Sequence, residues 1–134
     1  RELDCPVVIC HKTREKANVV SSITAIGEVE GRDIVIVDDM IDTAGTLSKA
    51  AEVLMSKGAN SVRACATHGI LSGNAFNNIN SSPLAEVMIT DTIPLHTAPE
   101  VDTSKITVIT MAEVFASIIR KVYYYEPVST EFIF

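Results

Sequence analysis

The chain passes from apolar to polar within one short stretch, Ile34-Val35-Ile36-Val37-Asp38-Asp39-Met40-Ile41-Asp42-Thr43-Ala44-Gly45-Thr46. Residues 34–37 are β-favouring and apolar without alternation, which is typical of a parallel-sheet strand buried on both faces. Two carboxylates follow at once, and in open α/β sheets ligands bind beyond the carboxyl ends of the strands. The stretch therefore predicts a buried strand that ends at a ligand site.

Small and polar residues, 42–46, form the predicted loop after this strand, and apolar residues then recur at helical spacing over residues 47–57 before Gly58. The first N–H groups of a helix have no partner within it and lie at the positive end of its dipole, which suits a phosphate. The same residues also fit an ordinary turn in which Asp42 or Thr43 caps the helix. The pattern alone leaves both interpretations open.

Asp38 and Asp39 bring two carboxylates to the same predicted edge of the sheet. Carboxylate oxygens accept hydrogen bonds from sugar hydroxyls, whereas backbone N–H groups suit a phosphate. Successive strand residues face opposite sides, so both carboxylates reach one ligand only if the chain bends there. A phosphorylated sugar would use both the carboxylates and the loop.

The segment 37–46 closely resembles the signature shared by type I phosphoribosyltransferases and ribose-phosphate diphosphokinases. Its residues match the diphosphokinase version of that signature. Further agreement lies at Lys12 and Arg14, at residues 66–73 and at residues 90–94, so that the resemblance covers nearly the whole chain. It implies one domain over residues 1–134 with a type I phosphoribosyltransferase-like α/β fold, a mostly parallel twisted sheet with helices on both faces. Strands that alternate with helical segments support this fold independently.

The resemblance implies a reaction in which MgATP gives its diphosphoryl group to the anomeric hydroxyl of ribose 5-phosphate, forming phosphoribosyl diphosphate and AMP for nucleotide biosynthesis. Lys12 and Arg14 are implied as the catalytic pair of a flexible loop. The implied ribose 5-phosphate site comprises Arg14, Asp38, Asp39, Asp42, Thr43, Ala44, Gly45 and Thr46.

The family also implies what this chain lacks. Mg²⁺ is expected to come with the co-substrate ATP, because the family's main metal ligands belong to an N-terminal half. The chain is accordingly expected to be the C-terminal domain of a longer homo-oligomeric synthetase, and to be inactive alone.

The composition agrees with a soluble globular domain: 134 residues, 47% hydrophobic and 21% charged. The net charge of -6 argues against nucleic acid as a partner, because such binding needs a basic face. No segment approaches the roughly 20 apolar residues of a membrane span. Three cysteines, an odd number, favour reduced thiols and a cytoplasmic location.

Further strands are expected over residues 6–10, 23–29, 62–67, 86–90 and 105–110, with residues 23–29 pairing with 33–37 through the turn 30–32. Residues 11–16 are expected to form a polar loop, and Ser72 to cap a short helix through Ile79. Residues 111–123 predict an amphipathic helix whose apolar stripe faces the core. His68 is interpreted as structural and His96 as a solvated loop residue.

Two alternatives remain beside the diphosphokinase. A type I phosphoribosyltransferase shares the signature but consumes phosphoribosyl diphosphate, and residues 12–19 and 68–73 favour the diphosphokinase over it. A non-catalytic regulatory protein that assembles with an active synthetase is the second alternative, and the presence of Lys12 and Arg14 argues against it.

Overall fold

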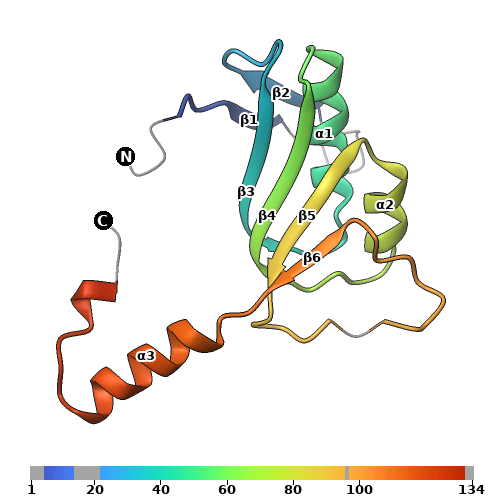
Figure 1. The fold of residues 1–134 in the computed structure, drawn as a ribbon. Helices are drawn as coiled ribbons and strands as arrows, with labels where there is room; N and C mark the ends of the chain where they lie inside the picture. The colour runs from blue at the N-terminus through green and yellow to red at the C-terminus, as the bar shows by residue number, and fades with distance from the viewer. Residues whose placement is uncertain (1–4, 14–21, 96, 132–134) are drawn as a thin grey trace.

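The computed structural model describes residues 5–13, 22–95 and 97–131, which form two small sheets, three α-helices and a final 3₁₀ turn (Figure 1). In chain order the elements are β1 (Ile9–Thr13), β2 (Ser22–Ile26), β3 (Asp33–Ile41), α1 (Gly45–Ser56), β4 (Ser61–Gly69), α2 (Ala75–Ser81), β5 (Leu84–Thr90), β6 (Ile106–Ile109), α3 (Ala112–Tyr123) and η1 (Ser129–Glu131). No described helix is long and apolar enough to cross a membrane.

The main sheet has four parallel strands in the order β3-β4-β5-β6, so that neighbours in the sheet are also neighbours in the sequence. Asp38 pairs with Ala66, Ala66 with Ile89, and Ile89 with Val108. This register brings the carboxyl ends of the strands to one edge. The predicted parallel α/β sheet is confirmed.

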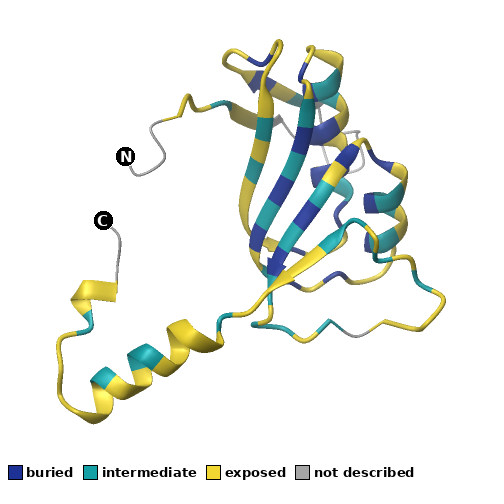
Figure 2. Cartoon of the chain, in the orientation of Figure 1, coloured by how far each residue is buried: buried dark blue, intermediate teal, exposed yellow. Residues whose placement is uncertain are grey.

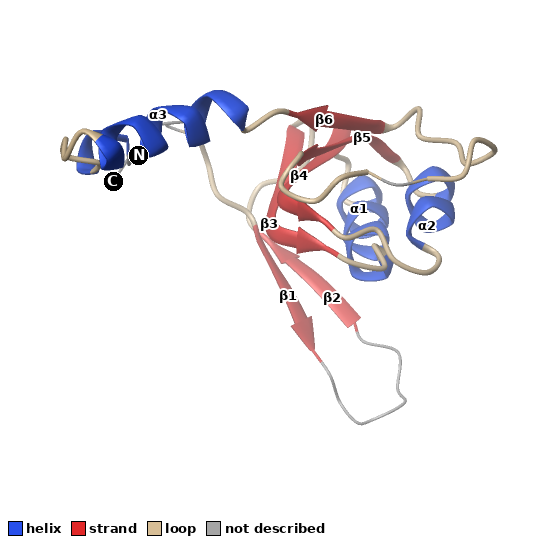
Figure 3. Ribbon diagram, turned by 90° about the horizontal axis from the view of Figure 1, so that it is seen from below, coloured by secondary structure: helices blue, strands red, loops and turns tan. Residues whose placement is uncertain are grey.

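The core lies between this sheet and the helices α1 and α2, which are both on one side of it (Figures 2 and 3). α1 contributes Leu47, Ala51 and Leu54, and α2 contributes Ala75 and Ile79. They pack against alternate residues of the central strands, among them Val62, Ala64, Val87 and Ile89. The two-residue period of a strand explains why only one face of β4 and β5 is deeply buried.

The expectation of a strand buried on both faces is wrong, and so is that of helices on both faces. Ile34 and Ile36 pack against the core, but Val35 and Val37 are 52% and 74% exposed. No described helix covers that second face of the sheet, which we call the open face. Four consecutive apolar residues therefore indicated a strand correctly but not its burial.

α3 does not pack against the core as expected. It extends away from the sheet (Figure 1), and none of its residues, all of which the structure describes, is buried. Its apolar side chains face solvent, with Phe115 50% and Ile119 67% exposed. Polar side chains of α3 contact the 3₁₀ turn that follows it, where Lys121 contacts Thr130 and Glu131, and Ser117 donates to Glu131.

The N-terminal strands also differ from expectation. β2 pairs antiparallel with β1 in a separate two-stranded sheet, and not with β3. Residues 11–13 belong to β1 instead of a loop, and β2 ends at Ile26 because Gly27 takes a positive φ of 133°. A β-carbon at Gly27 would lie 3.1 Å from a methyl of Val8, so this turn also needs the close approach that glycine permits.

Candidate functional site

The loop between β3 and α1 lies at the carboxyl edge of the sheet, as predicted. α1 begins at Gly45, two residues earlier than expected, and its N-cap is Ala44 in the left-handed conformation, with φ 58° and ψ 5°. Neither Asp42 nor Thr43 is the N-cap, and α1 has no side-chain cap. The Ala44 carbonyl accepts the Ser48 N–H (2.9 Å) and the Ser48 hydroxyl (2.9 Å). The first turn of α1 therefore presents its N–H groups at the sheet edge.

Side chains from the segment after β4 hold this loop. The Asn78 side-chain amide donates to the Thr43 carbonyl oxygen at 2.8 Å, and the Ser72 hydroxyl donates to the Asp42 carboxylate. Ser72 is therefore not the cap of α2, whose N-cap is Asn74. The sequence analysis missed both contacts, because nothing local in residues 72–78 points to a loop 30 or more residues earlier.

Asp38 and Asp39 both lie within β3, which continues to Ile41, but the alternation of burial along the strand is interrupted there: Ile36 and Ile41 both pack in the core, and residues 37–40 between them are all exposed. Each side chain is exposed and accepts a neighbouring backbone N–H. Asp38 Oδ1 accepts from Asp39 at 2.9 Å, and Asp39 Oδ1 accepts from Met40 at 2.8 Å. These local bonds limit the rotation of both carboxylates at the sheet edge.

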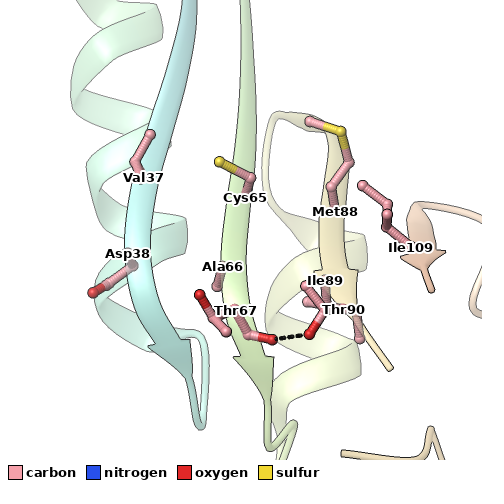
Figure 4. Close-up of a pocket in the computed structure, with 9 residues that line it drawn as sticks. All are labelled: Val37, Asp38, Cys65, Ala66, Thr67, Met88, Ile89, Thr90 and Ile109. Carbon is pink, nitrogen blue, oxygen red and sulfur yellow. Dashed lines mark hydrogen bonds between the residues drawn. The ribbon is translucent and has the colours of Figure 1, made fainter. Parts of the chain in front are cut away.

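A shallow hollow of about 180 Å³ lies on the sheet beside this edge (Figure 4). It is lined by Val37, Asp38, Cys65, Ala66, Thr67, Met88, Ile89, Thr90 and Ile109. Of the predicted site residues only Asp38 lines it, and most of its lining is apolar. The hollow is therefore separate from the predicted phosphate loop, none of whose residues 42–46 lines it.

A group of hydrogen bonds joins the ends of β4 and β5 near the same edge. The hydroxyls of Thr90 and Thr92 both donate to the Thr67 carbonyl oxygen, at 2.6 and 3.0 Å. The Thr92 hydroxyl also lies within hydrogen-bond distance of the Thr90 hydroxyl and of His68 Nδ1, at 2.9 Å from each. His68 thus ties β4 to the residues that follow β5. His96 lies outside the described residues.

Asp91 links the end of β5 to the start of α3. Its Oδ1 accepts the Met111 N–H at 2.8 Å. The Thr110 hydroxyl, and after it the Met111 N–H, lower the pKa of Asp91 because both bond to the charged carboxylate.

The described part of the chain does not include the side chains of Lys12 and Arg14, the two predicted catalytic residues. The backbone of Lys12 lies in β1, paired with Ile23, and its side chain is outside what the structure describes. Arg14 lies wholly outside the described residues. Their roles stay predictions.

The chain is similar to known proteins over nearly its whole length. Residues 6–133 match the sequence profile of a family described as the phosphoribosyl synthetase-associated domain. The chain is 48% identical over 132 residues to a ribose-phosphate pyrophosphokinase of Wolinella succinogenes, and 49% identical over 130 residues to one of Shewanella oneidensis. The matches cover 98% and 96% of this chain but 41% of each relative.

A crystal structure of phosphoribosylpyrophosphate synthetase from Mycobacterium smegmatis has a similar fold. It superposes with a TM-score of 0.78 at 34% sequence identity, over 90% of this chain and 37% of that one. The chain thus spans about two fifths of the length of the proteins it matches.

Proposed function

The chain belongs to the phosphoribosyl synthetase-associated domain family, and on that premise we propose that it carries the ribose 5-phosphate site of a ribose-phosphate diphosphokinase. The observation that carries the proposal is the loop 42–46, where the left-handed turn at Ala44 joins a parallel strand to the start of a helix. Backbone N–H groups at such a junction suit a phosphate. The names of the relatives, at close to half identity, support the same ligand.

In this proposal the 5-phosphate binds to the N–H groups of the loop and to the exposed hydroxyls of Thr43 and Thr46. Asp38 and Asp39 accept hydrogen bonds from the ribose hydroxyls. One oxygen of each carboxylate accepts a backbone N–H, and we assign the second oxygen to the sugar.

The proposed reaction moves the diphosphoryl group of ATP to the anomeric hydroxyl of ribose 5-phosphate. Phosphoryl transfer needs mainly positioning and compensation of the charge that builds up on the transferred group. We assign that compensation to Lys12 and Arg14, with Arg14 also near ribose 5-phosphate. This chain then supplies the acceptor sugar phosphate and the cationic pair.

The described residues do not suit a resident metal site, because no group of three or more His, Cys, Asp or Glu among them could hold an ion. We therefore propose that Mg²⁺ arrives with ATP, and assign no residue of this chain to it. The resemblance also supports a cytoplasmic homo-oligomer as the complete enzyme. The placement of this chain in the C-terminal half of that enzyme stays a prediction.

Calorimetric titration of this chain with ribose 5-phosphate tests the proposal. We expect binding, and we expect Asp38→Asn to raise Kd by about 10- to 100-fold, since a hydrogen bond to a charged group contributes about 1.5–3 kcal/mol. Asp33→Asn, at the opposite end of β3, is the matched control and should leave Kd within about twofold. A folded chain that does not bind, or an Asp38→Asn variant that binds like the parent, contradicts the proposal.

A further inference from the structure

We propose that Ser72 and Asn78 are positioning residues that hold the loop 42–44 in its phosphate-binding shape. This inference rests on the proposed function of the loop. Neither residue belongs to the signature in residues 37–46; both come from the segment that follows β4, 30 and 35 residues away from their partners. Two separate contacts, one to a carbonyl and one to a carboxylate, fix the loop at two successive residues.

Asn78 controls the orientation of one peptide group. Its side-chain amide donates to the Thr43 carbonyl at 2.8 Å. A peptide group is planar and trans, so fixing the Thr43 carbonyl also fixes the Ala44 N–H on the opposite side of the same plane. That N–H is one of the loop donors of the proposed phosphate site. Asn78 therefore determines where this donor points without touching the ligand.

The helix that carries Asn78 is itself firmly held. Ala75 and Ile79, on either side of Asn78 in α2, are 0% exposed. At the C-terminal end of α2, Lys105 Nζ donates to the carbonyls of Asn80 and Ser82 at 3.1 and 2.8 Å. Asn78 also links α2 to the first turn of α1, because its carbonyl accepts the Ser48 hydroxyl at 2.9 Å. The position of Asn78 is therefore fixed by contacts of α2 with the core and with Lys105.

Ser72 holds the side chain of Asp42, the carboxylate within the loop 42–44. Its hydroxyl donates to Asp42 Oδ1. A carboxylate facing a bound phosphate would repel it, so a phosphate loop that contains an aspartate needs that side chain directed elsewhere. The Ser72 bond gives Asp42 a partner in the segment after β4. We therefore assign Asp42 to anchoring of the loop.

The loop needs such anchors because Ala44 is not glycine. An alanine in the left-handed region is less stable than in ordinary backbone conformations by about 1–2 kcal/mol, and such a conformation persists only where the surroundings hold it. Removal of an anchor should therefore loosen the loop while the rest of the fold stays intact.

The test compares Asn78→Ala with Asn77→Ala in calorimetric titrations with ribose 5-phosphate. Asn77 is the matched control, because it is the preceding residue of α2 and its amide bonds only within the segment, to Asn74 at 2.7 Å. We expect Asn78→Ala to raise Kd about three- to tenfold, the range for one lost hydrogen bond, and Asn77→Ala to leave it within twofold. Equal effects of the two variants would overturn the proposal.

Ser72 provides an independent variant if Asn78→Ala fails to fold. Ser72→Ala should raise Kd about threefold at unchanged melting temperature, and Ser72→Thr, which keeps the hydroxyl, should restore it. A Ser72→Ala variant that binds like the parent chain, or a Ser72→Thr variant as weak as Ser72→Ala, counts against the role of Ser72.

A measurement without ligand separates this inference from the proposed function. In ¹⁵N relaxation experiments, Asn78→Ala should lower the heteronuclear NOE of residues 43–46, and Asn77→Ala should not. If the folded parent chain does not bind ribose 5-phosphate, the proposed function fails, and the relaxation data alone decide whether Asn78 holds the loop. Unchanged NOE values in Asn78→Ala would overturn the inference whatever the ligand does.

Discussion

At the scale of single residues, Ala44 shows what the sequence could not reveal. The small residues 43–46 correctly predicted a tight turn before a helix, although Gly45 and Thr46 already belong to α1, and the alternative interpretation that Asp42 or Thr43 caps the helix is wrong. In the structure the N-cap of α1 is Ala44, which is 5% exposed and has the left-handed conformation. Ser48 and Asn78 stabilise that choice through contacts that a local pattern does not contain.

The conformation of Ala44 gives a test of the loop in terms of stability. A β-branched side chain is strongly disfavoured at positive φ, and this position has little free space. We expect Ala44→Val to lower the free energy of unfolding by about 2–3 kcal/mol in urea denaturation. Ala85→Val, at an exposed position of β5, is the control and should change it by less than about 0.5 kcal/mol. A loss at Ala44 no larger than that at Ala85 would contradict the assigned backbone conformation.

At the scale of elements, the main strands and the edge where they end were predictable, because apolar runs and turn residues are local signals. The pairing of the strands was less predictable, because β2 pairs with β1 and not with β3. The burial of β3 was not predicted either, since one of its faces is exposed. The burial of a strand depends on whether a helix packs on each face of the sheet. The residues of β3 alone do not specify which helices pack there. The amphipathic pattern of α3 likewise indicated a helix but not what it packs against.

The junction between β5 and α3 should depend on acidity. Hydrogen bonds from Thr110 and Met111 lower the pKa of Asp91, so the charged carboxylate stabilises the folded junction at every pH above the unfolded pKa. This contribution is lost as the pH falls through the lower, folded pKa. We expect the Met111 amide resonance to shift with a midpoint below about 3.9, the usual aspartate pKa. Asp91→Asn should abolish the shift, and a midpoint at or above 3.9 would contradict the assignment.

At the scale of the whole molecule, the described chain leaves large apolar side chains exposed on two surfaces. One is the open face of the sheet, with Val35 and Val37, and the other is α3, with Phe115 and Ile119. Monomeric proteins rarely leave such surfaces uncovered. The composition indicated an ordinary globular domain, because percentages count apolar residues without saying how many of them the fold buries.

These surfaces should make the isolated chain associate with itself. We expect sedimentation velocity to show mass above that of the monomer at concentrations of tens of micromolar, with binding of a hydrophobic dye. Ile119→Glu should reduce both, because it places a charge on the apolar side of α3. Ala116→Glu adds the same charge at another exposed position of α3 and serves as the control. Equal effects of the two substitutions, or a strictly monomeric parent, would contradict this prediction.

The strand order of the main sheet has a consequence for how the protein is made. Because β3, β4, β5 and β6 lie side by side in the order of the sequence, each strand emerging from the ribosome finds its partner already synthesised. The sheet can therefore be completed in the order of translation. The loop after β3 is different: its anchors, Ser72 and Asn78, are synthesised only after β4. The segment proposed to bind phosphate is thus translated early but reaches its final shape only after α2 has formed.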